Sequence, residues 1–359
     1  MAFLSRLPWI TKPLVVGAPM RVFASPELAV AVSAAGGLGF IGPGAKTEHM
    51  QPDLERAREL IRTKYQSLDS VSSTKASGAT SSVLPVGVGF QLWSDHLETA
   101  TRLIEQYRPC AVWLFAPRDE RKDIDLWSRS VREAYSDAQV WVQIGTVAEV
   151  ERLLELSRPP DVIVAQGAEA GGHGRAEDGT GIITLVPEIA DLLSQRGSNI
   201  PIIAAGGIAD GRGAAAAHCL GAKGVALGSR FLAASEARIS KGYQQEVVRA
   251  SDGGPSTTRT LLYNHLRGTF GWPKEYAPRT IINRSFIDHR AGASFESLQV
   301  LHDEATAKGD DGWGPEGRLA TYAGASVGLI RDVKPAGQIV QDLQREMQSI
   351  LSRGLDAKI

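Results

Sequence analysis

One histidine stands where its side chain could take part in catalysis. His173 lies between two glycines in residues 161–174 (DVIVAQGAEAGGHG), directly after a run of apolar residues. An imidazole has an unperturbed pKa of about 6.5, so it can act as a general acid or base near neutral pH. The loop has no apolar helix face into which the ring could pack as a structural residue, and this favours a functional role. We expect structural roles for the other histidines, of which only His265 is a candidate to line a cavity.

Two pairs of small residues predict a phosphate site. Gly206-Gly207 and Gly228-Ser229 each follow a short apolar run within residues 200–231. Glycine lets backbone N–H groups approach a ligand closely, because no β-carbon holds the chain away. In barrels of alternating strands and helices, the loops after the last two strands commonly bind phosphate in this way, together with a helix N-terminus. Asp210 is expected to cap the following helix rather than to contact the ligand.

The elements that must position these residues alternate regularly along the chain. Short apolar runs rich in β-branched residues alternate with longer amphipathic stretches, which predicts parallel strands joined by crossover helices. The expected strands are residues 14–17, 38–41, 83–88, 111–115, 140–144, 162–166, 200–204 and 224–227. The expected helices include residues 26–35, 53–65, 96–107, 147–156, 186–195, 211–220 and 336–352. Eight such units predict an α/β fold of the (β/α)8 TIM-barrel class.

Three parts are expected within this fold. Residues 1–230 would form the barrel, residues 231–321 a helical cap inserted after the eighth strand, and residues 322–359 the closing segment with the last helix. The cap is expected over the mouth of the barrel and would bound the space for a substrate. Residues 69–82 (DSVSSTKASGATSS) form a polar insertion between the second helix and the third strand.

Composition excludes several classes of function. The formal net charge of -1 over 359 residues offers no electrostatic basis for binding nucleic acid or an anionic membrane. No apolar run is long enough to span a membrane. The two cysteines, Cys110 and Cys219, are too few for a zinc or iron–sulfur site, so we expect no metal and a reducing, cytoplasmic compartment. A peroxisomal location remains an alternative, because Ala357-Lys358-Ile359 is similar to the SKL address.

Five ordered motifs resemble the nitronate monooxygenases, formerly called 2-nitropropane dioxygenases. They are residues 17–20 (GAPM), 35–42 (AGGLGFIG), 161–173, 205–212 (AGGIADGR) and 224–231 (GVALGSRF). The similarity covers residues 8–235, with a weaker echo in residues 322–332 (YAGASVGLIRD). The resemblance implies a flavoprotein that binds FMN, with His173 at the position of the family's catalytic histidine.

The same resemblance implies a set of cofactor-binding residues. Those expected beside the flavin ring are Ala18, Pro19, Met20, Gln143, Gln166, Ala170, Gly171 and Gly172. Those expected at the phosphate are Gly206, Gly207, Gly228 and Ser229. Gly89 is also expected to contact the cofactor, at a position where some members have an asparagine that reaches the flavin. Ala325 stands where the bacterial pattern carries a glutamine. Fewer polar contacts to the ring would weaken FMN binding or reshape the substrate space.

The leading functional hypothesis is an FMN-dependent monooxygenase. It would oxidise alkyl nitronates with O2 to a carbonyl compound and nitrite. Whether neutral nitroalkanes are also substrates is left open by the sequence. His173 would either abstract the α-proton of a nitroalkane or orient a preformed nitronate by a hydrogen bond. The expected partners are this small-molecule substrate and O2, and the expected assembly is a monomer or a homodimer.

Two alternatives remain open from the sequence. One is an NAD(P)H-dependent FMN reductase of quinones or enoyl thioesters, because such barrels share the AGGH stretch that carries His173. The other is a flavin-binding protein without turnover, against which the intact histidine argues. Chemistry of the inosine-monophosphate-dehydrogenase type is excluded, because that reaction needs a nucleophilic cysteine and residues 167–181 contain none.

Overall fold

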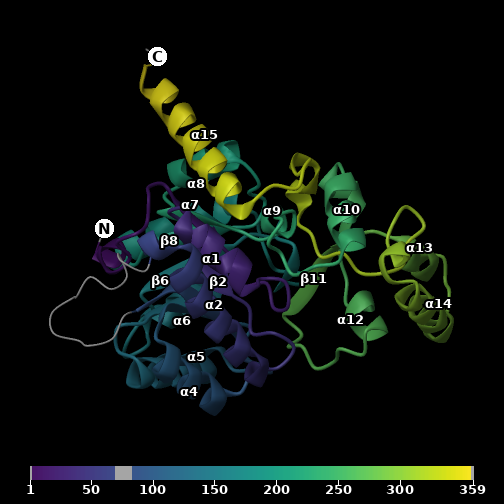
Figure 1. The fold of residues 1–359 in the computed structure, drawn as a ribbon, viewed down its shortest axis with the longest axis horizontal. Helices are drawn as coiled ribbons and strands as arrows, with labels where there is room; N and C mark the ends of the chain where they lie inside the picture. The colour runs from purple at the N-terminus through teal and green to yellow at the C-terminus, as the bar shows by residue number, and fades with distance from the viewer. Residues whose placement is uncertain (1, 69–82, 357–359) are drawn as a thin grey trace.

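The computed structural model describes residues 2–68 and 83–356 and contains a closed barrel of eight parallel strands (Figure 1). In order around the barrel, the strands are β1 (Leu14–Gly17), β2 (Leu38–Ile41), β3 (Leu84–Gln91), β4 (Pro109–Phe115), β5 (Gln139–Ile144), β6 (Val162–Gln166), β8 (Ile202–Ala205) and β9 (Gly224–Leu227). The predicted TIM barrel is therefore confirmed. The polar insertion and the C-terminal tripeptide named above lie outside the described residues.

The strand boundaries depart from the prediction in two informative places. β8 begins at Ile202 rather than at residue 200, because Pro201 has no N–H to give to the ladder. β3 extends to Gln91, where the expected strand stopped at residue 88, and its last residues pair with Trp113–Phe115 of β4. Two glycines in this part of β3 weaken the local strand signal, so the pairing with β4 decides its length.

Helices cover the outside of the barrel (Figure 1). They are α1 (Pro26–Ala34), α2 (Met50–Lys64), α4 (Leu97–Tyr107), α5 (Glu120–Ala134), α6 (Val147–Leu154), α7 (Ile182–Gln195), α8 (Gly211–Cys219) and the closing helix α15 (Ala336–Asp356). The carboxylate of Asp210 accepts hydrogen bonds from the backbone N–H groups of Arg212 and Gly213, which confirms its predicted role as the cap of α8.

Side chains fill the interior of the barrel. Phe40 lies between Trp113 and Trp141, with its ring centroid 5.2 Å from each of theirs, and all three side chains are buried. Such packing makes the barrel a solid core rather than a pore. A ligand of the barrel must therefore bind at one of its ends, where loops leave the strands.

The segment after β9 combines short helices with two strands. The helices are α9 (Ser229–Leu232), α10 (Lys241–Arg249), α11 (Gly253–Ser256), α12 (Leu262–Leu266), α13 (Arg284–Arg290) and α14 (Phe295–Ala307), and the 3-10 turns of this segment are η3 (Gly309–Gly312) and η4 (Ala325–Leu329). Two further 3-10 turns, η1 (Ala2–Arg6) and η2 (Thr47–His49), lie before the helices α1 and α2 respectively. The strands β10 (Thr257–Arg259) and β11 (Tyr276–Ile281) form an antiparallel sheet with β7 (Gly172–Arg175), which follows barrel strand β6. In Figure 1, α13 and α14 lie on the side of the molecule away from α4–α6.

This small sheet changes two expectations. The glycine-rich stretch that carries His173 is a strand and not a loop, because β11 pairs with it and sets Pro278 opposite His173. The expected helical cap likewise contains two strands. Its division from the barrel at residues 231 and 321 stays a prediction.

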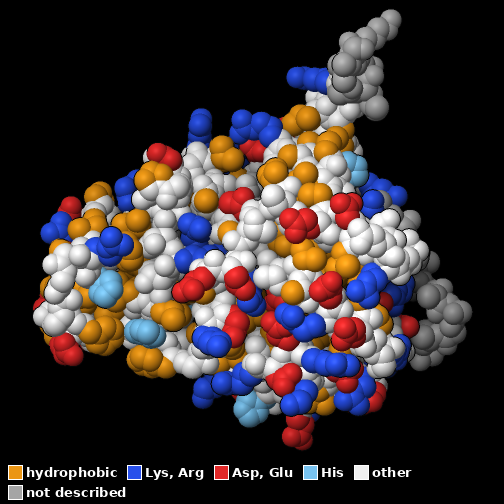
Figure 2. All heavy atoms as spheres, turned by 180° about the vertical axis from the view of Figure 1, so that it is seen from behind, with side chains coloured by type: hydrophobic (Ala, Val, Ile, Leu, Met, Phe, Trp, Pro, Cys, Tyr) orange, Lys and Arg blue, Asp and Glu red, His pale blue; other side chains and the backbone are white. Residues whose placement is uncertain are grey.

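The surface shows no concentration of one charge in the face drawn in Figure 2. Basic and acidic side chains are interspersed over it, which agrees with a net charge of -1. Among the residues described, no helix has the length and apolarity needed to cross a membrane.

Candidate active site

A cavity of about 590 Å³ opens at the carboxyl ends of the barrel strands. Its volume lies in the range typical of small-molecule and cofactor sites. Thirteen of the fourteen predicted site residues line it, and they are Ala18, Pro19, Met20, Gln143, Gln166, Ala170, Gly171, Gly172, His173, Gly206, Gly207, Gly228 and Ser229. Residues that lie up to about two hundred positions apart in the chain therefore meet at one end of the barrel.

Gly89 is the predicted residue that does not line this cavity. It lies in β3 beneath Pro19, and a β-carbon at this position would come within 2.3 Å of the Pro19 Cβ. Gly89 therefore lets Pro19 pack onto β3. An asparagine here would require Pro19 to move.

The loops after β8 and β9 present unpaired donors to the cavity. Gly206 and Gly207 have φ angles of 95° and 74°, a conformation that favours glycine. Within the described parts of the chain, the backbone N–H groups of Gly206, Gly207, Gly228 and Ser229 donate to no other residue. The Ser229 hydroxyl accepts a hydrogen bond from Gly324 N at 2.8 Å, so its own proton is free to be donated. Asp210 closes the N-terminus of α8, which leaves the loops themselves to bind an anion.

Two glutamines are oriented by hydrogen bonds behind the cavity. Trp113 donates from Nε1 to the Oε1 atom of Gln143 at 2.9 Å, which leaves the amide NH2 of Gln143 as its free end. Gln166 donates from Nε2 to the carbonyl of His173 at 3.1 Å. Gln143 thus offers donors to the cavity, whereas Gln166 helps to fix the strand that carries the histidine.

His173 is held on two sides. Its ring stacks on Trp272, with centroids 3.5 Å apart and planes inclined by 5°. Its Nε2 atom lies 2.8 Å from Nδ2 of Asn264, a residue with no exposed surface. Burial, followed by the charges of Arg267, Arg259 and Arg21, lowers the pKa of His173 well below its usual value. The imidazole is therefore neutral at neutral pH.

Arg259 forms hydrogen bonds with the backbone that leads into β7, the strand that carries His173. From β10, its guanidinium donates to the carbonyls of Ala168, Ala170, Gly172 and Ala277 at 2.6–3.2 Å. Burial lowers the pKa of Arg259 to about 10, so the group stays charged at neutral pH. One side chain thus holds the backbone of residues 168–172 beside the cavity.

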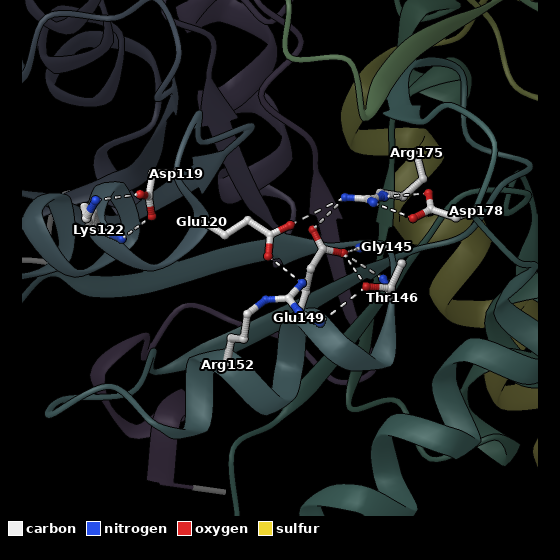
Figure 3. Close-up of polar contacts among 9 residues, drawn as sticks. All are labelled: Asp119, Glu120, Lys122, Gly145, Thr146, Glu149, Arg152, Arg175 and Asp178. Carbon is white, nitrogen blue, oxygen red and sulfur yellow. Dashed lines mark hydrogen bonds and ion pairs between the residues drawn. The ribbon is translucent and has the colours of Figure 1, made fainter.

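The far end of β7 is fixed by an ionic network (Figure 3). Arg175 lies between Asp178, Glu149 of α6 and Glu120 of α5. The buried Glu149 also accepts hydrogen bonds from the N–H groups of Gly145 and Thr146, each at 2.8 Å. Burial raises the pKa of Glu149, whereas the Gly145 N–H group and Arg175 act in the opposite direction. The network joins the strand that carries His173 to the barrel helices.

Several residues of the cavity had no recognised signal in the sequence. They are Arg21, Gln91, Trp93, Phe115, Arg267, Trp272 and Tyr322. Arg21 directly follows the GAPM motif, and Tyr322 begins the echo at residues 322–332, so both could have been suspected. Trp272 and Arg267 lie in the long segment after β9, where no motif marks them. His265, the other candidate histidine, stacks on Phe270 and is not among the residues lining the cavity.

Comparison with known sequences identifies one family over nearly the whole chain. A family model described as nitronate monooxygenase matches residues 4–346. The nitronate monooxygenase npaC of Metarhizium robertsii is 55% identical over 351 residues, which are 98% of this chain and 95% of that protein. A nitronate monooxygenase of Neurospora crassa is 33% identical over 372 residues, covering 97% of this chain and 93% of that protein.

Solved structures share the fold along the whole length. FabK from Thermotoga maritima has a TM-score of 0.67 at 26% identity and covers 98% of this chain and 97% of its own. A nitroalkane oxidase from Streptomyces ansochromogenes has a TM-score of 0.71 at 23% identity and covers 98% of this chain and 99% of its own. At this identity, the second similarity concerns the fold alone.

Proposed function

The chain belongs to the nitronate monooxygenase family, and we propose that it binds FMN and oxidises alkyl nitronates with O2 to a carbonyl compound and nitrite. Family membership makes it an oxidoreductase and indicates a flavin cofactor. The choice of FMN and the assignment of its binding residues are our inference from the cavity. The observation that carries this inference is the set of unpaired N–H groups at the ends of β8 and β9, in the same cavity as His173.

The residues at one end of the cavity fit a phosphate. Four backbone N–H groups and the Ser229 hydroxyl offer hydrogen-bond donors where the predicted phosphate site lies. An added β-carbon on Gly207 would lie 3.2 Å from the Glu169 Cβ, so the narrow space depends on glycine. A phosphate monoester matches this donor set, because it brings several acceptor oxygens and a negative charge.

Residues next to the predicted phosphate site fit a planar ring. Ala18, Pro19 and Met20 line the cavity beyond β1, and Ala170 and Gly171 line it after β6. Because these groups are small or apolar, they leave room beside them for a flat ring. The free amide of Gln143 would donate to the polar edge of the ring.

Within this site, the chain's own residues would bind and orient the nitronate. When bound, FMN supplies the one-electron oxidation of the nitronate and the reaction with O2. The neutral His173 would contact the nitronate, and its ring is kept in place by Trp272. Arg21 and Arg267 also line the cavity, and their positive charges favour an anionic substrate over its neutral form.

The function is tested by identifying the chromophore of the purified protein and following its absorbance under anaerobic conditions. We expect FMN and rapid bleaching on addition of a nitronate. Rapid bleaching by NAD(P)H with no response to a nitronate would instead support the reductase. Bound FMN that responds to neither would support a flavin-binding protein without turnover.

The phosphate assignment is tested at Gly207. Gly207→Asp should abolish the flavin absorbance of the purified protein, because the new carboxylate would be forced against Glu169 and would add negative charge beside the predicted phosphate site. Gly207→Ala is the matched control, since it carries the same strain from the positive φ without the charge and should retain more flavin. Stoichiometric FMN in a folded Gly207→Asp protein would show that the phosphate lies elsewhere.

A further inference from the structure

A buried chain of hydrogen bonds runs away from His173 into the segment after β9. Nδ2 of Asn264 lies 2.8 Å from Nε2 of His173, and the hydroxyl of Tyr322 lies 3.0 Å from Oδ1 of Asn264. Asn264 has no exposed surface and Tyr322 is buried. Asn264 thus links two side chains of the cavity wall, His173 and Tyr322.

The protons in these hydrogen bonds can be assigned by starting at Tyr322 and proceeding to His173. Burial raises the pKa of Tyr322, so the phenol keeps its proton and donates it to Oδ1 of Asn264. The amide then turns its NH2 toward His173, and Nε2 accepts. The opposite orientation of the amide would leave the Tyr322 proton without a protein acceptor among the described residues, which is unfavourable for a buried hydroxyl.

The remaining ring nitrogen of His173 follows from this assignment. A neutral imidazole has one N–H group and one lone pair, and Asn264 already occupies the lone pair of Nε2. The proton must therefore be on Nδ1. No hydrogen bond joins Nδ1 to another of the described residues, and the ring lines the cavity.

We propose that Asn264, supported by Tyr322, is a positioning residue that holds His173 in the Nδ1–H tautomer, so that the site meets its substrate with a hydrogen-bond donor and not with a base. This inference rests on the proposed function. A donor suits a preformed nitronate, whose negative charge lies largely on its two oxygens. It does not suit a neutral nitroalkane, whose α-proton needs an acceptor. Asn264 thereby selects the nitronate as the substrate form.

Exchanging one atom of Asn264 should reverse the tautomer. In Asn264→Asp, the carboxylate can only accept, so His173 would donate from Nε2 and expose a lone pair on Nδ1. The charges that face His173, on Arg267, Arg259 and Arg21, favour the ionised carboxylate. Nδ1 could then take the α-proton of a nitroalkane: the C–H bond breaks and an N–H bond forms, which leaves the imidazole positively charged. The electron pair of the C–H bond becomes the C=N bond of the nitronate, and the N=O π pair moves to oxygen, which carries the negative charge.

The tautomer is measured by NMR on the flavin-loaded protein with 15N-labelled histidine. Two-bond 1H–15N correlations distinguish Nδ1–H from Nε2–H, and His173→Asn identifies the His173 signals among those of the seven histidines. We expect Nδ1–H in the wild type and Nε2–H in Asn264→Asp. An Nε2–H signal in the wild type would overturn the inference and leave the proposed function intact.

The consequence for specificity is measured with nitroethane and its nitronate. The ratio of kcat/KM for the neutral form to kcat/KM for the nitronate should rise about 10- to 100-fold in Asn264→Asp, since a general base contributes at least this much. Asn264→Leu has a similar size but no hydrogen bond, so it fixes neither tautomer; it should lower the activity with the nitronate and raise the ratio by less than Asn264→Asp. Tyr322→Phe removes the phenol that fixes the orientation of the Asn264 amide, so the amide can rotate by 180°. This variant should raise the ratio by less than Asn264→Asp.

The two proposals fail in different ways. A ratio that stays unchanged in folded, flavin-loaded Asn264→Asp would overturn the role of Asn264. A wild-type protein that binds flavin but turns over no nitronate would overturn the proposed function, whichever tautomer the NMR spectrum shows.

Discussion

Three side chains of the site share one arrangement at the scale of single residues. Trp113 donates a hydrogen bond to the oxygen of Gln143, and the N–H group of Gly324 donates one to the oxygen of Ser229. Asn264 likewise donates to one nitrogen of His173 in the proposed assignment. In each case the protein satisfies the acceptor and leaves a donor free. A cavity that presents donors stabilises negative charge, as a phosphate and a nitronate both require.

Removing the donor of His173 should weaken the reaction of the nitronate. A hydrogen bond to a charged group contributes about 1.5–3 kcal/mol, so His173→Ala should lower kcat/KM for a nitronate about 10- to 100-fold. His173→Asn has an N–H group of its own and should recover part of this loss. Steady-state kinetics of both variants, loaded with equal amounts of flavin, measure the effect. Wild-type activity in His173→Ala would remove His173 from the site's chemistry.

At the scale of elements, the site depends on a strand that the barrel does not contain. β7 follows β6 but pairs with β11, and its two ends are fixed separately. Arg259 binds the backbone before and at its start, and Arg175 joins its end to the acidic residues of α5 and α6 (Figure 3). His173 lies between these two attachments, so its position is set by elements on both sides of the cavity.

The hydrogen bonds from Arg259 to residues 168–172 should be important for flavin binding, because they hold the backbone that lines the cavity. Arg259→Met keeps the length and apolar part of the side chain but removes its hydrogen bonds to four carbonyls, of which, among the residues described, only that of Ala168 keeps a second side-chain donor, Arg279. We expect a loss of about 2–3 kcal/mol in the free energy of unfolding, measured in denaturant, together with weaker retention of flavin on dialysis. Arg345→Met is the control, because Arg345 is largely exposed and its loss should change stability by about 0.5 kcal/mol or less. Equal behaviour of the two variants would contradict the role given to Arg259.

At the scale of the whole molecule, the cavity is assembled from distant parts of the chain. Its walls come from the strands β1 to β9 or the segments that follow them, from residues between α12 and β11, and from residues 322–326. Unfolding separates all of these segments. A ligand that fills the cavity therefore binds the folded state alone and stabilises it by mass action.

FMN should accordingly raise the melting temperature of the flavin-free protein. At a free concentration of 100 times the dissociation constant, the stabilisation is about 2.7 kcal/mol, and it grows with the logarithm of concentration. Riboflavin lacks the phosphate and cannot use the donors of Gly206, Gly207, Gly228 and Ser229, so it should stabilise much less at the same concentration. Calorimetry or fluorescence-monitored melting with both ligands tests this. Equal shifts would show that the phosphate contributes nothing to binding.

Local sequence determined most of the barrel and one wall of the site. The bounds of β1, β2, β6 and β9 agree with the expected strands, because short runs of apolar residues next to glycine or polar turns specify a buried strand with little help from elsewhere. Glycines at strand ends and the lone histidine between two glycines were likewise visible. These signals depend on residue types a few positions apart, which is the range over which backbone preference acts.

Tertiary structure alone decided what surrounds His173. Trp272 contacts its ring, Asn264 contacts its Nε2 atom, and Arg259 donates to the carbonyl of the preceding Gly172, all from positions about 90 residues further along the chain. Along the chain they are an aromatic residue in a loop, an amide on a short helix and a basic residue in a strand of three. The pairing of β11 with β7 brings them to the cavity, and this pairing is a long-range contact. The presence of the histidine could thus be predicted from the sequence, whereas its tautomer and charge depend on packing between distant segments.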